Sequence, residues 1–159
     1  MAGGRLTGYE ASFAPAMRAA LAEADAAVAT EDVPVGAVIL DEAGAIIARG
    51  RNRREADDDP TAHAEIVAIR AAARAVGGWR LDGLTLVVTL EPCTMCAGAI
   101  TAARLGRLVY GAEDARAGAV GSLWDVVRDQ RLGPRPEVIG GVLAEECQRV
   151  IVRFFADRR

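Results

Sequence analysis

The chain has a single histidine, His63, and it lies two residues before Glu65; two cysteines follow, spaced three residues apart as Cys93 and Cys96. An imidazole and two thiolates are typical zinc ligands, and three protein ligands leave the fourth position open, as in catalytic zinc sites. Zinc in such a site lowers the pKa of water to about 7. The spacing therefore predicts one zinc ion per subunit, held by His63, Cys93 and Cys96, with Glu65 as the catalytic acid and base rather than a ligand.

Both motifs lie where a helix is expected to begin. The first helix is predicted over residues 61–76, where Gly77-Gly78 ends it, and the second runs from Pro92 to about residue 104. The helix dipole at such a start lowers the pKa of a thiol. Residues two apart on a regular helix differ by about 200°. His63 and Glu65 can therefore converge only if the helix points end-on at the metal, so we expect both helix N-termini to face it.

The remaining elements indicate how these helices are positioned. Apolar residues at helical spacing predict helices over residues 12–29 and 143–156, and a short helix is expected over 123–129. Strands are predicted over these ranges: 35–40 and 45–48, which form a hairpin, then 84–89, 108–110 and 137–139. The order predicts an α/β protein with a three-layer α/β/α fold, in which a five-stranded mixed sheet has helices on both faces.

Composition fits a single globular domain. The chain has 159 residues, of which 52% are hydrophobic, and a net charge of −3, which argues against a polyanion-binding surface over the whole molecule but permits a local basic patch. Its longest apolar run, residues 84–90, is far shorter than the roughly 20 residues of a membrane span. Three cysteines without a secretory signal favour metal chemistry over disulfides. We expect a cytoplasmic protein with no membrane partner, in which residues 1–11 are a disordered N-terminus and residues 12–159 one domain.

Other uses of these residues are possible. A Cys-x-x-Cys pair also serves redox chemistry or structural zinc. The main alternative is a closed structural site with Cys147 as the fourth ligand, in a zinc-stabilised interaction module. Cys147 falls on the apolar side of the last predicted helix, where a free cysteine packs as a small hydrophobe. A closed site would also leave Glu65 without a role, so a catalytic zinc is expected.

His-x-Glu followed by Pro-Cys-x-x-Cys is the signature of zinc-dependent nucleobase deaminases. With it, the chain resembles the bacterial tRNA-specific adenosine deaminases of the cytidine deaminase-like superfamily, from about residue 13 to residue 156. The zinc motif alone identifies only the superfamily, whose members also deaminate free bases. Two segments, residues 111–123 and 141–147, point to the tRNA branch.

The resemblance implies a function and a set of contacts. Residues 12–159 would form a single zinc-dependent deaminase domain that converts adenosine to inosine at the wobble position of a tRNA anticodon loop. Glu65 would carry a proton from zinc-activated water to the ring nitrogen and then to the leaving ammonia. The residues matching the family's substrate contacts are Asn52 for the base, Val33 for an apolar wall, and Asp114 and Arg116 for neighbouring sugars and phosphates. A homodimer that acts on tRNA, with no DNA partner, is expected.

Each contact residue also has a local explanation. Asn52 could be a turn residue beside Gly50, and Asp114 could cap the segment that follows. The chain also departs from the family, which usually carries Asn-His where this sequence has Gly133-Pro134, and often a lysine where it has Arg116. These departures leave a free base or nucleoside, such as guanine or cytosine, as the alternative substrate.

Overall fold

A five-stranded mixed sheet forms the centre of the computed structural model, which describes residues 5–159. The strands are β1 (Gly36–Leu40), β2 (Ile46–Arg51), β3 (Thr85–Leu90), β4 (Arg107–Ala112) and β5 (Glu137–Ile139). They are ordered β2-β1-β3-β4-β5, where β1 is antiparallel to β2 and β3, while β4 is parallel to β3 and β5. The predicted strands and the mixed sheet are confirmed.

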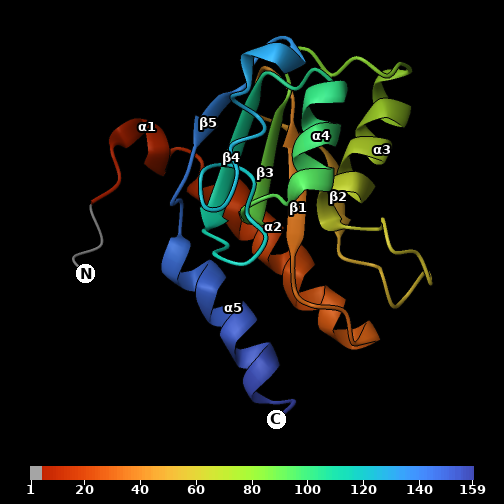
Figure 1. Cartoon of the computed structure of the whole chain (residues 1–159), viewed down its shortest axis with the longest axis vertical. Helices are drawn as coiled ribbons and strands as arrows, with labels where there is room; N and C mark the ends of the chain where they lie inside the picture. The colour runs from red at the N-terminus through yellow and green to blue at the C-terminus, as the bar shows by residue number, and fades with distance from the viewer. Residues whose placement is uncertain (1–4) are drawn as a thin grey trace.

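Helices cover both faces of the sheet, which confirms the three-layer α/β/α fold (Figure 1). On one face lie α3 (Ala64–Val76) and α4 (Thr94–Ala102), and on the other lie α2 (Ala14–Ala27) and α5 (Ala144–Ala156). The short 3-10 helix Val28–Thr30 extends α2. None of the described helices is long and apolar enough to cross a membrane.

The core follows the alternation of side chains along each strand, although the central strands are buried on both faces. Leu86 and Leu108 face the layer of α3 and α4, whereas Val87 and Val109 face the layer of α2 and α5. All four side chains are fully buried. The parallel pair β3–β4 is thus packed on both sides, and α4 begins shortly after β3 ends.

Part of the segment expected to be disordered is ordered. Residues 1–4 lie outside the described part of the chain, but Gly8–Ala11 forms helix α1, closed at its start by a capping box. The Tyr9 hydroxyl donates to Glu137 of β5 at 2.9 Å. Within the segment expected to be disordered, the structure thus has a short helix with a local cap and a long-range contact.

The helix expected over residues 123–129 does not form. The chain instead turns back on itself, with an isolated bridge between Val120 and Asp125, and a 3-10 helix follows at Gln130–Leu132. Gly121 takes a positive φ of 121° and donates its amide to the Trp124 carbonyl at 2.8 Å. The glycine permits a tight turn that the apolar spacing of this segment did not predict.

Gly50 sets how closely α3 approaches the sheet. A Cβ atom at this position of β2 would lie 2.5 Å from the Ala64 carbonyl oxygen and 2.6 Å from the Ala68 amide nitrogen. Both are backbone atoms of α3 and cannot rotate away. A side chain here would therefore displace the start of α3 from the sheet.

We expect Gly50→Ala to lower the free energy of unfolding by about 1–3 kcal/mol, because the added methyl group overpacks the contact between β2 and α3. Urea denaturation measures the effect. Gly78→Ala is the matched control, since nothing lies within 4 Å of a Cβ atom there. A Gly50→Ala variant as stable as that control would show that α3 moves freely on the sheet.

Candidate active site

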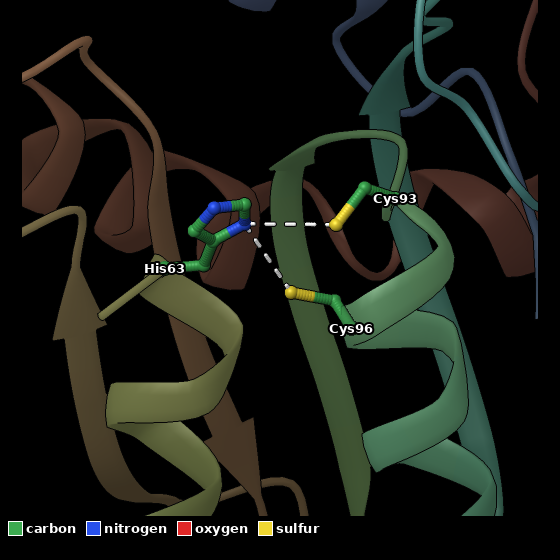
Figure 2. A group of neighbouring side chains, drawn as sticks. All are labelled: His63, Cys93 and Cys96. Carbon is green, nitrogen blue, oxygen red and sulfur yellow. Dashed lines mark hydrogen bonds between the residues drawn. The ribbon is translucent and has the colours of Figure 1, made fainter. Parts of the chain in front are cut away.

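The two helices α3 and α4 begin at the same place. His63 is the N-cap residue of α3 and Cys93 is the N-cap residue of α4; each has an extended backbone, and neither side chain caps its own helix. Figure 2 shows both side chains projecting from the helix starts toward one point. The helices begin two or three residues later than predicted from residue 61 and from Pro92, because His63 and Cys93 have extended backbones. The starts of α3 and α4 converge, as expected from the sequence.

Three candidate ligand atoms meet at this point. His63 Nδ1 lies 3.6 Å from the Cys93 sulfur and 3.6 Å from the Cys96 sulfur, drawn as dashed lines in Figure 2. With zinc–nitrogen and zinc–sulfur bonds of about 2.0 and 2.3 Å, a tetrahedral site separates nitrogen from sulfur by about 3.6 Å. The donor atoms thus have the types and the spacing that a tetrahedral zinc ion requires, and three of them leave one position free.

The two cysteines converge because of their helix positions. Cys93 is the N-cap residue of α4 and Cys96 is at the third helical position, the same pair of positions whose side chains meet in a capping box. A hydrogen bond with Cys96 lowers the pKa of Cys93 to about 3, and the same bond, together with burial, raises the pKa of Cys96. A hydrogen bond with Cys93 also raises the pKa of His63. The lowered pKa of Cys93 favours its thiolate, the form in which cysteine binds metal ions.

Cys147 does not belong to this group. The candidate metal ligands found among the described residues are His63, Cys93 and Cys96. Cys147 is buried on α5 in the opposite layer, where its sulfur packs against Gly111 of β4. The alternative of a closed site with Cys147 as fourth ligand is contradicted, because the sheet separates this thiol from the other three ligands.

Glu65 lies at the second position of α3 and is 4% exposed. It lines a cavity of about 160 Å³ together with His63 and Cys93 but lies outside the ligand group. Burial raises the pKa of its carboxyl, since the charged form is disfavoured in an apolar environment. Glu65 is therefore placed to hold a proton beside the three ligands without occupying a coordination position.

The cavity is smaller than typical drug-sized pockets of roughly 300–1,000 Å³, so it suits a single ring system. Val33, Asn52 and Asp114 line it, as expected for substrate contacts. Arg116 does not line the cavity; it lies in an adjoining groove of about 710 Å³ between the loop after β4 and α5. Arg54, which the sequence analysis did not single out, reaches the cavity rim.

Two of the expected contact residues also have local partners. Asn52 is buried; its side-chain amide donates to the Val33 carbonyl at 3.1 Å, and its oxygen accepts from the Arg54 amide at 3.2 Å. The Asp114 carboxylate accepts from the Arg116 amide at 2.9 Å. Both residues therefore shape turns, and the same turns put them at the cavity wall.

Two buried carboxylates that the sequence analysis missed hold the loops around the cavity. Asp32 is 1% exposed and accepts hydrogen bonds from the backbone amides of Glu55 at 2.7 Å and Ala56 at 3.2 Å. Glu91 is 2% exposed and accepts hydrogen bonds from the backbone amides of Asp114 and Ser122. An acidic residue directly before a ligand-bearing Pro-Cys pair was the signal that could have identified Glu91.

The departure at Gly133-Pro134 lies away from the cavity. Gly133 has a positive φ of 97°, and its nearest side chain is Arg104, which follows the C-terminal end of α4. The candidate ligand Cys93 is at the other end of that helix. The change from the family pattern therefore leaves the cavity wall of this chain intact.

Comparison with known proteins agrees with this geometry. Residues 13–112 match the family described as cytidine and deoxycytidylate deaminase zinc-binding region. The tRNA-specific adenosine deaminase of Haemophilus influenzae is 50% identical over 143 residues, which are 90% of this chain and 83% of that protein.

Two solved structures are also similar. One comes from a study of A-to-I editing by tRNA:A34 deaminases at the wobble position; it has a TM-score of 0.82 and 45% identity over 86% of this chain and 98% of its own. The guanine deaminase of Nitrosomonas europaea has a TM-score of 0.73 and 26% identity, over 96% of this chain and 94% of its own. The chain therefore belongs to the cytidine and deoxycytidylate deaminase family, within its branch of tRNA-specific adenosine deaminases.

Proposed function

We propose that this chain hydrolyses the exocyclic amine of adenosine at the wobble position of a tRNA anticodon loop, releasing ammonia and leaving inosine. The observation that carries the proposal is the arrangement of His63, Cys93 and Cys96 at tetrahedral spacing beside a buried carboxyl and a cavity for one ring system. Membership of the tRNA-specific branch supports the choice of adenosine in tRNA over other bases.

His63, Cys93 and Cys96 would hold one zinc ion per subunit. Zinc bound by such ligands supplies a nucleophile at neutral pH by polarising water. Glu65 would move one proton of the attacking water to the ring nitrogen next to the amine-bearing carbon. It would then move the remaining proton of that oxygen to the amine, which leaves as ammonia while the carbon–oxygen bond becomes the carbonyl of inosine. Because Glu65 is 4% exposed, its carboxyl has little contact with bulk water.

The surroundings of the cavity support a polynucleotide substrate. The groove beside it shares Val33, Leu90 and Asp114 with the cavity and continues along α5 past Phe155. Single-stranded RNA is commonly recognised by extruding one base into a pocket while neighbouring nucleotides lie on apolar or basic side chains. In this proposal the base contacts Asn52 and Val33, and the adjacent phosphates and sugars contact Asp114 and Arg116.

A free base is the second candidate substrate. The size of the cavity and the similarity to a guanine deaminase favour it. The groove of about 710 Å³ next to the cavity favours RNA, because a free base would leave that groove unused.

We also propose a homodimer in the cytoplasm, where tRNA is found, with neither DNA nor membrane as a partner. The outward face of α4 is free of charged side chains, with Thr94, Met95 and Gly98 exposed or half-buried, and Leu123 and Trp124 expose apolar side chains on the loop after β4. Uncharged surfaces of this kind suit a subunit interface.

Glu65→Gln should lower kcat about 10²–10⁴-fold on an arginine tRNA with an ACG anticodon, because the amide cannot move protons. Inosine at the wobble position is measured by nuclease digestion and mass spectrometry. Glu42→Gln, in the exposed hairpin loop between β1 and β2, is the control and should keep full activity. If zinc-loaded wild-type protein forms no inosine, the tRNA proposal is contradicted. Ammonia release from guanine, cytosine and nucleosides would then test the second candidate substrate.

Metal analysis of purified protein should find one zinc ion per subunit, with a mass of two subunits by light scattering. His63→Ala removes a ligand and should abolish binding, whereas Cys147→Ala should retain the metal, because that thiol lies in the opposite layer. Loss of zinc from Cys147→Ala, or its retention by His63→Ala, would be incompatible with the proposed ligands.

Arg116→Gln should raise KM for the RNA substrate and leave the hydrolysis of free adenosine unchanged. If this guanidinium contacts one phosphate, the slope of log affinity against log salt should become shallower by roughly 0.7. Arg80→Gln, whose exposed side chain pairs with Asp82, is the control. An unaltered salt slope in Arg116→Gln would remove this residue from the RNA contacts.

A further inference from the structure

Glu91 is a buried carboxylate whose partners all belong to one loop. Its two oxygens accept the Asp114 amide at 3.2 Å, the Ser122 amide at 3.2 Å and the Ser122 hydroxyl at 3.0 Å. Among residues 5–159, no arginine forms an ion pair with it. A carboxylate buried without a cation is costly unless it is hydrogen-bonded, so the carboxylate and the loop hold each other in place.

The same loop is tied to the backbone around Glu91. The Glu91 amide donates to the Ala112 carbonyl at 2.8 Å, and the Ala119 amide donates to the Pro92 carbonyl at 2.8 Å. Gly118 packs directly on the carboxylate, where a Cβ atom would overlap a Glu91 side-chain oxygen. The segment leading to Cys93 and the loop over residues 113–122 therefore form one hydrogen-bonded unit.

We propose that Glu91 is a positioning residue that sets the substrate-binding loop against the metal-binding segment. It holds the loop at Asp114 and at Ser122, and Arg116 lies between these two points of attachment. Glu91 lines the cavity, but both of its oxygens accept hydrogen bonds from the loop, so we assign it a role through the loop rather than on the reacting atoms. The substrate part of this inference rests on the proposed function; the loop-holding part does not.

The inference separates binding from chemistry. If Glu91 places the loop, its loss should weaken binding of the RNA while His63, Cys93, Cys96 and Glu65 continue to act. We expect Glu91→Gln to raise KM for an anticodon stem-loop about tenfold, because an amide cannot accept all three hydrogen bonds. We expect kcat to stay within about threefold and the zinc content to stay unchanged.

The experiment combines these kinetics with hydrogen exchange of the loop amides in zinc-loaded protein. Glu91→Gln should speed exchange over residues 113–122 about tenfold. Ser122→Ala removes one hydrogen bond from an exposed residue, so it folds even if Glu91→Gln does not, and it should give a smaller change of the same kind. Glu137→Gln is the matched control. It alters a hydrogen-bonded carboxylate on β5, beside Arg107 at the start of β4 and away from the loop that follows β4, and it should change neither KM nor loop exchange.

Unchanged KM and unchanged loop exchange in Ser122→Ala and in any folded Glu91→Gln protein would overturn the proposal. So would a fall in kcat accompanied by zinc loss, because Glu91 would then act on the metal site. If wild-type protein makes no inosine, the proposed function fails while loop exchange still decides whether Glu91 holds the loop.

Discussion

Helices α3 and α4 on one face of the sheet begin close to each other, and the active site depends on where the first turn of each helix lies. His63 and Cys93 are both N-cap residues, so each can direct its side chain past the end of its helix. The contact of Gly50 with α3 brings that helix close to the sheet. Because this contact involves Ala64, the residue after His63, it helps to set where the His63 side chain meets the two sulfur atoms.

Two buried carboxylates fix the loops around the cavity. Asp32 holds the loop after β2 through two backbone amides, and Glu91 holds the loop after β4 in the same manner. Each carboxylate is buried and bonds to main chain, which leaves loop side chains free for other contacts. In the proposed function the chemistry resides on helix starts while the substrate contacts lie on loops, an arrangement that lets substrate preference vary within one family without altering the metal ligands.

The sequence predicted the sheet and the four longer helices, because hydrophobic periodicity is a local pattern. Metal-ligand spacing singled out His63, Cys93 and Cys96, which the structure brings together. Prediction from the sequence failed where contacts that hydrophobic periodicity does not encode decide the outcome. Helix α1 depends on Tyr9 reaching Glu137, and the turn at Gly121 replaces a helix that apolar spacing favoured. Glu91 was missed for the same reason, since its role appears only when Ser122 is brought back beside it.

X-ray absorption at the zinc edge of the purified protein tests the central claim most directly, because it reports the ligands without assuming a substrate. The account predicts two sulfur neighbours at about 2.3 Å and two lighter neighbours, nitrogen or oxygen, at about 2.0 Å. One of the lighter neighbours is His63, and the other belongs to the open position. A zinc ion with three or four sulfur neighbours, or protein that binds no zinc, would contradict the account.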